Sequence, residues 1–394
     1  MIPATLLERI KNSSVEWKAL GEISELIRGH GLPKNVFSES GIPAIHYGQI
    51  YTYYGLSTEK TISFVTHETA LKLRKVNYGD VIITNTSENL EDVGKSLVYL
   101  GKEQAVTGGH ATILKPKQSI LGKYFAYWTQ INDFYKKKIK FTKGTKVIDL
   151  STGDLAKIII PLPPLDIQNE IVHILDTFTE LTTELTAERN ARQKQYQYYR
   201  DLLLSEQELA KIGFEWKTLG EIAKNLDSMR QPITNGLRKA GEIPYCGASG
   251  VIDYVDNYIF DGDYLLISED GANLVVRKTP IAFSISGKSW VNNHVHVLEF
   301  ETYAERRFVE IYLNSIDLAP YISGAAQPKL NQQNLNSIKI PLPSLSEQAR
   351  IVAILDQFDT LTHSITEGLP REIKLRQQQY EYYRDVLLSF PTPT

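Results

Sequence analysis

The sequence IPLPPLDIQNEIVHILDTFTEL begins at Ile160, and a second version of it, IPLPSLSEQARIVAILDQFDTL, begins at Ile340. The prolines favour extended backbone and end any helix that precedes them. Asp166 and Ser346 then stand at equivalent positions, where each is a favourable helix N-cap. The apolar side chains that follow keep helical spacing, and we expect eight of them to pair the helices: Ile174, Phe178, Leu181, Leu185, Ile354, Phe358, Leu361 and Ile365. The block therefore predicts two long helices paired antiparallel as a coiled coil.

Two further blocks show that the whole chain is duplicated. WKALGEI at Trp17 returns as WKTLGEI at Trp216, and YQYYRDLLLS at Tyr196 returns as YEYYRDVLLS at Tyr380. The three blocks keep the same order in both halves, and an internal repeat of this kind decides the architecture. We therefore expect internal pseudo-two-fold symmetry.

The duplication is circular. The chain ends soon after Leu388, where the equivalent stretch of the first half continues into EQELAKIGFEWKTLG, and that continuation resembles LLERIKNSSVEWKALG at the start of the chain. We therefore expect residues 1–15 to pack beside the C-terminal helix, so that one chain imitates a symmetric dimer.

The second long helix departs from the first. It carries four extra residues around Gly368-Leu-Pro370. A proline inside a helix breaks or kinks it, and four extra residues shift the heptad phase. A break is expected near Pro370, whereas a continuous helix over 166–205 would span about 60 Å.

The stretches between these blocks differ between the two halves. Short β-like runs over 44–47, 80–84, 96–100, 264–267 and 294–298 alternate with glycine turns, and helices are expected over 122–133 and 304–315. The sequence predicts an α+β protein with mixed domains over 1–163 and 211–343, and long helices over 164–210 and 344–394.

Composition excludes several classes. A chain of 394 residues with 42% hydrophobic and 23% charged residues fits two soluble globular domains. A single cysteine, Cys246, excludes an internal disulfide and a multi-cysteine zinc site and suits the cytoplasm. The start of the chain lacks a signal-peptide pattern, and no run of 18 apolar residues occurs. We expect a cytoplasmic protein.

The formal net charge of −3 does not indicate a nucleic-acid binder, so the local distribution of charge decides. Residues 135–146 read YKKKIKFTKGTK, which holds six lysines and no acid. Such a run suits contact with phosphates, but a solvated lysine face explains it equally well.

No motif for catalysis is complete. The glycine-rich cofactor turn and the Asn/Asp-Pro-Pro-aromatic turn of a DNA methyltransferase are absent, and neither Gly94-Lys-Ser96 nor Gly287-Lys-Ser289 has the earlier glycine of a phosphate-binding loop. Glu16-Trp-Lys18 and Glu215-Trp-Lys217 resemble part of a nuclease metal site, but a packing role for the tryptophan explains them better. We expect no catalytic residue, no metal and no cofactor.

Histidines occupy matched places in the two halves. His110 matches His294, and His296 is expected on the same strand face as His294. Without cysteines or a carboxylate cluster nearby in the sequence, a zinc site is disfavoured. A polar residue at the domain edge, in contact with DNA, competes here with a structural histidine.

The doubled blocks resemble those of type I restriction-modification specificity subunits over essentially the whole chain. The most specific stretches are Gly144-Thr-Lys-Val-Ile-Asp-Leu-Ser151, Ile160-Pro-Leu-Pro-Pro-Leu165, and Ile171-Val-His-Ile-Leu-Asp176 with its counterpart Ile351-Val-Ala-Ile-Leu-Asp356. The resemblance implies two target-recognition domains, each reading half of a bipartite DNA site. It also implies that the helices set the spacing and dock two methyltransferase subunits, with translocating nuclease subunits as further partners. Where the first half has Gly144-Thr-Lys-Val, the second has Gly324-Ala-Ala-Gln, which puts an identical grip on phosphate in doubt.

Loops and strand edges can offer polar side chains to base edges in the major groove, while lysines bind phosphates. On chemistry and loop position we expect DNA contacts from residues of both domains. In the first domain they are Tyr47, Gln49, Asn85, Ser87, His110, Lys136, Lys137, Lys138, Lys143, Thr145 and Lys146; in the second they are Tyr245, Ser249, Ser268, Glu269, Asp270, His294, Gln327 and Lys329.

Two other classes stay open at this point. A coiled-coil scaffold with two non-DNA ligand-binding heads would show no affinity for duplex DNA even with partner subunits. A nuclease with an unrecognised site would cleave DNA alone in the presence of a divalent metal.

Overall fold

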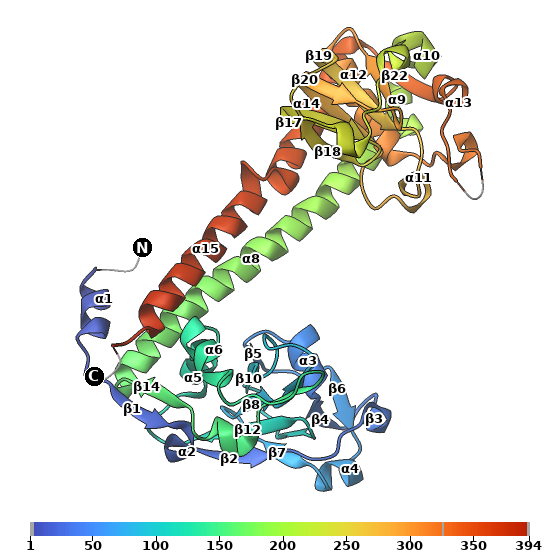
Figure 1. Ribbon diagram of the computed structural model, residues 1–394. Helices are drawn as coiled ribbons and strands as arrows, with labels where there is room; N and C mark the ends of the chain where they lie inside the picture. The colour runs from blue at the N-terminus through green and yellow to red at the C-terminus, as the bar shows by residue number, and fades with distance from the viewer. Residues whose placement is uncertain (1–3, 325–326, 392–394) are drawn as a thin grey trace. The chain divides into compact units, whose positions relative to one another are not determined.

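The computed structural model describes residues 4–324 and 327–391, which belong to two compact units (Figure 1). The first unit comprises residues 1–184 and 373–394, and the second comprises residues 185–372. Each unit contains one of the divergent stretches together with parts of the long helices. Each mixes helices with strands, as expected for an α+β protein.

The first long helix, α8 (Leu165–Leu203), is continuous over 39 residues. The second is broken into α14 (Leu345–His363) and α15 (Gly368–Leu388). Pro370 lies in the first turn of α15, where its missing N–H leaves no hydrogen bond unmade. Gly368 has a φ of +70°, and a Cβ there would lie 2.4 Å from the Thr360 carbonyl oxygen. The break predicted near Pro370 is therefore confirmed.

Three details of the helix prediction are wrong. Ile365 lies in the break between α14 and α15 and is 82% exposed, so it does not pair the helices. Ser346 is not the N-cap of α14, because the Ser344 side chain already accepts from the Glu347 N–H. Likewise α8 begins at Leu165, which places Asp166 in the first turn, where it meets Arg9 at 3.3 Å.

The same pair of stacked rings holds the helices in each unit. In the first unit Phe178 of α8 stacks on Tyr383 of α15, with ring centroids 5.5 Å apart. In the second unit Phe358 of α14 stacks on Tyr199 of α8 at 5.6 Å. Helices α8 and α14 run antiparallel in the second unit. Arg189 precedes Tyr199 on α8, and it donates to the carbonyl of Thr362, which follows Phe358 on α14. The pairing predicted from the repeat is confirmed there.

The first unit contains two five-stranded sheets with short helices around them. Its helices are α1 (Ala4–Lys11), α2 (Leu20–Ile23), α3 (Tyr47–Thr52), α4 (His67–Leu71), α5 (Gly122–Trp128), α6 (Asn132–Lys138) and α7 (Thr152–Leu155). Its strands are β1 (Glu16–Ala19), β2 (Ser24–Arg28), β3 (Phe37–Ser38), β4 (Ile42–Ile45), β5 (Ser57–Thr58), β6 (Ser63–Val65), β7 (Arg74–Val76), β8 (Val81–Thr84), β9 (Thr86–Ser87), β10 (Ser96–Tyr99), β11 (Ala105–Thr107), β12 (Ala111–Pro116), β13 (Ile148–Asp149) and β14 (Ile159–Leu162). The sheet orders are β2-β12-β8-β10-β5 and β3-β6-β4-β11-β7.

The strand predicted over 44–47 is shorter than expected. It ends at Ile45, because the His46 side chain accepts from the Gly48 N–H and caps α3. Tyr47 therefore opens a helix instead of closing a strand. The helix expected over 122–133 is likewise two helices, α5 and α6.

The second unit is built on one six-stranded sheet. Its helices, besides α14 and the parts of α8 and α15 that belong to it, are α9 (Glu206–Ile212), α10 (Leu219–Ile222), α11 (Asn273–Val276), α12 (Tyr303–Ser315) and α13 (Gln332–Asn336). Its strands are β15 (Phe214–Thr218), β16 (Lys224–Asn225), β17 (Ala240–Gly247), β18 (Gly250–Val255), β19 (Phe260–Ser268), β20 (Ala282–Val291), β21 (Val295–Glu299) and β22 (Lys339–Pro343). The sheet order is β16-β21-β19-β20-β17-β18.

The two units share a sheet core. Strands β2, β12, β8 and β10 of the first unit lie in the same order as β16, β21, β19 and β20 of the second. The register is also shared: Ala111 faces Thr84 in the first sheet, and Val295 faces Ser268 in the second, with the same sequence offset in both strands.

The second sheet of the first unit is repeated in part. Its parallel pair β4–β11, with Val106 opposite Ala44, matches the parallel pair β17–β20, with Trp290 opposite Tyr245. The offset that maps Ala111 onto Val295 also maps Val106 onto Trp290. The divergence therefore lies in the strands around these shared pairs.

The circular duplication is visible at both chain ends. In the first unit Ile10 of α1 is buried in the same apolar cluster as Leu387 and Leu388 of α15. In the second unit Leu209 of α9, which stands as far before Trp216 as Ile10 stands before Trp17, is buried in the equivalent cluster. The expected packing beside the C-terminal helix is therefore confirmed at Ile10, while residues 1–3 lie outside the described part.

An aspartate of each long helical stretch holds the domain helix that packs on it. Asp176 of α8 accepts from the Tyr127 hydroxyl and from the Lys123 ammonium of α5, both at 2.7 Å. Asp356 of α14 accepts from Arg307 Nε at 2.7 Å and from the Tyr303 hydroxyl at 2.6 Å, both on α12. The tyrosine and the cation have exchanged places along the helix, but each pair spans one helical turn.

Replacing Asp176 by asparagine should destabilise the first unit by about 1–3 kcal/mol, because the amide carries no charge and has one acceptor oxygen for the two donors, Lys123 and Tyr127. The midpoint of urea unfolding, followed by circular dichroism, measures the change. The matched control is Asp166→Asn on the same helix, whose carboxylate is 66% exposed in its pair with Arg9 and should contribute only about 0–1 kcal/mol. Equal midpoints for the two variants would show that Asp176 does not anchor the domain.

Candidate nucleic-acid interface

Each unit has an edge at which the two central strands end in the same way. In the first unit Asn85, just after β8, donates its backbone N–H to the carbonyl of His110, just before β12, at 2.8 Å. In the second unit Glu269, just after β19, donates to the carbonyl of His294, just before β21, at 2.9 Å. These strand ends match residue for residue, because the offset that maps Tyr196 onto Tyr380 also maps Asn85 onto Glu269 and His110 onto His294.

A tight turn lies against each strand end. Lys143 and Asp149 exchange two backbone hydrogen bonds of 2.9 and 2.8 Å, and Ser323 and Lys329 exchange two of 2.8 Å. Both turns pass through a glycine in the left-handed region, with φ of 99° at Gly144 and 83° at Gly324. The main chain of the turn is thus shared, although the side chains differ. Ala325 and Ala326 lie outside the described residues.

We call these two sites the first and second edges. The first edge comprises Thr86, His110 and the turn 143–149; the second comprises Asp270, His294 and the described residues of the turn 323–329. Thr86 pairs with Asp149 across β9 and β13, and Asp270 pairs with Lys329 in the same antiparallel way. The turn therefore joins the strand end directly in both units.

Aromatic residues of α3 support the first edge. The ring of Tyr47 lies 5.0 Å from that of His110, and the Tyr51 hydroxyl donates to the Thr86 carbonyl. The Thr86 hydroxyl and His110 Nδ1 are 2.9 Å apart. Lys143, Thr145 and Lys146 of the turn are exposed. The predicted residues Tyr47, His110 and the turn therefore come together, and Ser87 lies beside them opposite Ile148.

The lysine run does not form one face. Lys138 is only 4% exposed, and its ammonium donates to the carbonyls of Val93 at 2.6 Å and Glu91 at 3.0 Å. Burial lowers the pKa of Lys138 to about 8. Lys137 pairs with Asp133 at 2.9 Å and lies over the ring of Trp17, whereas Lys136 is exposed. The expectation that Lys138 faces phosphate is therefore wrong, because α6 turns this residue into the core.

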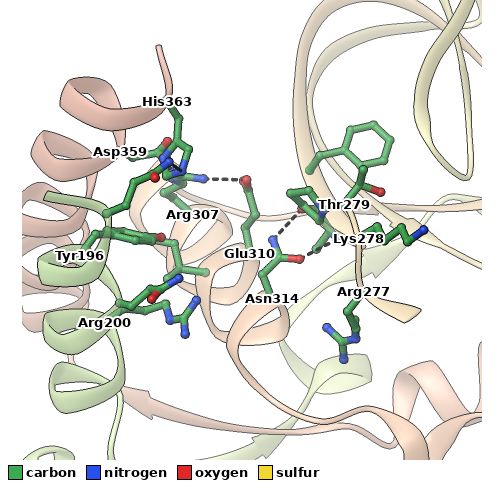
Figure 2. Close-up of a pocket in the computed structure, with 16 residues that line it drawn as sticks. Tyr196, Arg200, Arg277, Lys278, Thr279, Arg307, Glu310, Asn314, Asp359 and His363 are labelled. Carbon is green, nitrogen blue, oxygen red and sulfur yellow. Dashed lines mark hydrogen bonds and ion pairs between the residues drawn. The ribbon is translucent and has the colours of Figure 1, made fainter. Parts of the chain in front are cut away.

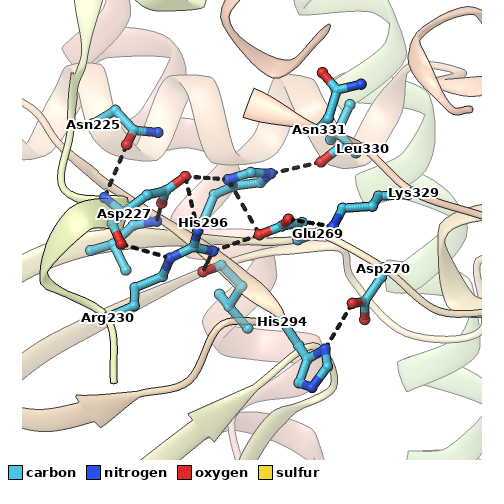
Figure 3. A network of polar contacts seen from close by, with 12 residues as sticks. Asn225, Asp227, Arg230, Glu269, Asp270, His294, His296, Lys329, Leu330 and Asn331 are labelled. Carbon is cyan, nitrogen blue, oxygen red and sulfur yellow. Dashed lines mark hydrogen bonds and ion pairs between the residues drawn. The ribbon is translucent and has the colours of Figure 1, made fainter. Parts of the chain in front are cut away.

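Behind the second edge lies a buried ionic network (Figure 3). His296 is fully buried; its Nε2 lies 2.7 Å from the Leu330 carbonyl, and its Nδ1 lies 2.6 Å from Asp227. Glu269 receives Arg230 at 2.6 Å and Lys329 at 3.0 Å. Burial alone would raise the pKa of Asp227, but the hydrogen bond and charge of His296 bring it below its ordinary value.

His294 and His296 do not share a face. His294 precedes β21 and is exposed, with its Nδ1 2.7 Å from the Asp270 carboxylate, whereas His296 points into the network. Figure 3 shows the two rings on separate sides of the strand. The predicted common face is therefore wrong, because β21 begins only at Val295.

Four more predicted contact residues are buried. Asn85 donates to the Leu150 carbonyl at 2.6 Å, and Ser268 donates to the Ala248 carbonyl at 2.6 Å. The Tyr245 hydroxyl accepts from the Ile233 N–H at 2.9 Å, and Glu269 is held in the network described above. These side chains satisfy buried polar groups of the protein, so they are not available to bases in this conformation. Gln49, half-buried, binds Ser63 at 2.6 Å and serves the capping of α3.

Ser249, Gln327 and Lys329 are exposed. Ser249 lies in the turn between β17 and β18, and the other two lie in the turn of the second edge. The sequence patterns did not indicate Thr86, Tyr51 and Arg230. Thr86 could have been found, because the offset that maps His110 onto His294 also maps Thr86 onto Asp270.

A cavity of about 570 Å³ in the second unit is a separate feature (Figure 2). Several of its charged lining groups are held by other groups of the protein. Arg307 binds Glu310 at 2.6 Å and Asp359 at 2.9 Å, and Arg277 donates to the Ile316 carbonyl at 2.8 Å. The cavity occurs in the second unit and is not part of the arrangement that both units repeat, so the edges are the better candidate interface.

Metal-binding clusters and membrane spans were considered for the described residues. Over 4–324 and 327–391, no group of three or more His, Cys, Asp and Glu side chains is arranged to hold a metal ion. Within the same residues, no helix combines the length and apolar character that crossing a bilayer requires.

Comparison with known proteins gives the same family over both halves. The model of the type I restriction modification DNA specificity domain matches residues 12–194 and 211–375. The specificity subunit of the type I restriction enzyme EcoR124I/EcoR124II from Escherichia coli is 36% identical, covering 100% of this chain and 99% of that protein. A putative type I specificity subunit from Haemophilus influenzae is 31% identical, covering 98% of each chain.

Solved structures agree in fold. The S subunit of a type I restriction-modification system from M. genitalium matches with a TM-score of 0.60 at 16% identity, covering 97% of this chain and 98% of that one. A chain from a structure of type I restriction-modification complex assembly matches with a TM-score of 0.57, also at 16% identity, covering 95% and 97%. With two matched domains and a relative of this identity along its whole length, the chain belongs to the family of type I restriction-modification DNA specificity proteins.

Proposed function

We propose that this chain is the DNA-reading subunit of a type I restriction-modification complex, in which each unit reads one half of a bipartite duplex site. The observation that carries the proposal is the repetition of one edge, with the same main-chain hydrogen bonds and different side chains. A fixed main chain positions a domain on DNA, and variable side chains distinguish base edges. Two such edges in one chain suit a site of two unlike halves.

The first edge has the charge that phosphate contact requires. Lys143 and Lys146 are exposed on its turn, and Lys143 is 80% exposed despite a weak contact with Asp154 at 3.4 Å. In the second edge Lys329 is 52% exposed and forms an ion pair with Glu269. The two turns therefore differ in charge, and we propose that the first contributes more of the electrostatic affinity.

The long helices carry matched exposed tyrosines that suit docking of methyltransferase subunits. Tyr198 on α8 is 63% exposed and Tyr382 on α15 is 64% exposed, and the two are equivalent in the repeat. Each is followed by an exposed aspartate, Asp201 or Asp385, on the next turn. Exposed aromatic residues at equivalent places favour two copies of one partner. We propose that the helices dock two methyltransferase subunits and set the spacing of the half-sites; translocating nuclease subunits would join this assembly.

The chain itself performs no chemistry in this proposal and acts in the cytoplasm with its partners. Purified alone, it should neither methylate nor cleave duplex DNA, with or without Mg²⁺ and a methyl donor. Assembled with methyltransferase subunits, it should direct methylation to a bipartite sequence, seen by methylation mapping of the host genome. Methyl transfer or metal-dependent cleavage by the isolated chain would contradict the proposal, as would an assembled complex without affinity for duplex DNA.

Replacing Lys143 and Lys146 by alanine should weaken binding of the assembled complex to all duplex sequences alike. The slope of log affinity against log salt should fall by roughly 0.9 for each phosphate that is no longer neutralised. Fluorescence anisotropy at several salt concentrations measures it. Lys102→Ala is the control, since Lys102 is exposed beyond β10, at the end of these strands away from Thr84. An unchanged slope in the double variant would make this turn a solvated face.

Replacing Tyr198 or Tyr382 by alanine should remove one methyltransferase subunit from the complex, and replacing both should remove two. The affinity of each docking site should fall at least about tenfold, because an exposed tyrosine that a partner buries is a common hot spot. Native mass spectrometry reports the stoichiometry. Tyr53→Ala and Tyr78→Ala, with side chains 64% and 72% exposed outside the helices, serve as controls. Full assembly of the double variant would place the docking surface elsewhere.

A further inference from the structure

Two histidines stand at the same point of the two edges. His110 and His294 each precede a central strand, and each carbonyl accepts from the residue that follows the neighbouring strand. The Nδ1 of each ring also contacts the side chain of the residue that follows this backbone donor. The distances are 2.9 Å from His110 to Thr86 and 2.7 Å from His294 to Asp270. The arrangement therefore recurs down to the ring atom, inside stretches whose sequences otherwise differ.

The outer nitrogen of each ring is available. Both residues are exposed, and His294 keeps 53% of its side chain accessible. Among the residues that the structure describes, no hydrogen-bond partner meets either Nε2. His110 adopts a φ of 64°, a conformation that non-glycine residues seldom take and that often marks functional sites. The rings are thus fixed at Nδ1 and open at Nε2.

The partner at Nδ1 decides what Nε2 can do. A carboxylate accepts hydrogen bonds only, so Asp270 holds the proton of a neutral His294 on Nδ1 and leaves a lone pair on Nε2. The threonine hydroxyl both donates and accepts, so Thr86 permits either tautomer of His110. The neutral form of His294 is therefore an acceptor at Nε2, whereas the neutral form of His110 can donate or accept.

The surroundings of the second edge favour a base over a phosphate. The Asp270 carboxylate would repel a phosphate held against His294. A carboxylate can itself accept from the exocyclic amino group of cytosine, and an imidazole lone pair has the same preference. In the major groove such amino groups belong to N4 of cytosine and N6 of adenine. Guanine and thymine offer only acceptors there, which this pair would reject.

We propose that Asp270 and His294 form an acceptor pair that selects a cytosine or adenine amino group in one half-site, and that Thr86 and His110 form the equivalent but less restrictive pair for the other. The inference rests on the proposed function, because it assumes that the edges face DNA. Beyond the proposed function, it names the side chains that read one base pair in each half-site. It also gives the chemistry by which the second edge distinguishes bases with an amino group from bases without one.

The experiment uses the complex assembled with its methyltransferase subunits, at pH 8, on a duplex carrying the methylated sequence found by genome mapping. Each adenine or cytosine of the second half-site is replaced in turn by purine riboside or 2-pyrimidinone, which lack the exocyclic amino group. At one position, removal of the amino group should weaken binding by the native chain about 10- to 100-fold. In His294→Ala the same replacement should have little further effect, because the acceptor is already gone.

A second measurement follows the mapped sequence. Asp270→Asn should relax the choice at one position of one half while the other half stays unchanged, and His110→Ala should alter only the opposite half. Asp261→Asn is the matched control, since Asp261 is an exposed aspartate near the start of β19, whereas Asp270 follows its end. Thermal unfolding of the variants should match that of the native chain, because both side chains of the pair reach the surface.

The outcomes separate this inference from the proposed function. If the native complex methylates a bipartite sequence, but no amino-group removal depends on His294 and Asp270→Asn leaves the mapped sequence unchanged, the acceptor pair is refuted and the proposed function stands. If the native complex directs no methylation and binds no duplex, the proposed function itself fails. A change in both halves from Asp270→Asn would also overturn the pair, because it would show a general loss of fit.

Discussion

The aspartate at the end of each IVxILD block, Asp176 or Asp356, is the contact on which the placement of each domain on its helix depends. It accepts from two donors on one domain helix, at 2.6–2.7 Å, and so fixes the rotation of that helix as well as its distance. The domain helix packs on the central sheet, and the sheet ends in the edge. A change in the aspartate contact would therefore displace the residues of the edge. Charge-assisted hydrogen bonds are suited to this task because they are short and directional.

The stacked rings and the aspartate have different roles within each unit. Phe178 with Tyr383, and Phe358 with Tyr199, hold two helices together without fixing their direction of approach to the domain. The aspartate then joins the helix to the domain. Because each unit uses both devices, either domain is oriented by contacts of its own. The sequences between the blocks can then diverge, as long as the sheet core and the donors on the domain helix are retained.

The helices and the break could be predicted from the sequence because periodicity, proline and glycine act locally. Helix α8 and the interruption at Pro370 follow from these signals alone. Ile365 was assigned to the helix pair because the heptad pattern was continued beyond His363. The helix ends there, and the extra residues form the break that contains Ile365. The cap of α14 was misplaced, since Ser346 and Ser344 are equally good caps by type and only the backbone decides between them.

The site was harder to predict because side-chain direction is a tertiary property. Consecutive lysines on a helix point about 100° apart, so Lys138 enters the core while Lys136 stays in water. Asn85 and Ser268 lie at strand ends, where polar side chains were expected to point outward. Instead each donates a hydrogen bond to a backbone carbonyl of a neighbouring loop. The pairing of Thr86 with His110 joins the start of β9 to the residue before β12, and no local pattern predicts it. Only the repeat offset contained this information, since it maps Thr86 onto Asp270.

The two edges show why one fold can present unlike surfaces. The contacts that shape each edge are made by backbone N–H and C=O groups, which every residue except proline supplies in the same form. Side chains at the edge are therefore free to change without altering its shape. At matching positions the first edge has Thr86 opposite Asp149, and the second has Asp270 opposite Lys329. The acid lies on opposite sides of the pair in the two units, and its partner across the pair is a lysine only in the second. The charge pattern at the edge therefore differs between the units, although the path of the main chain does not.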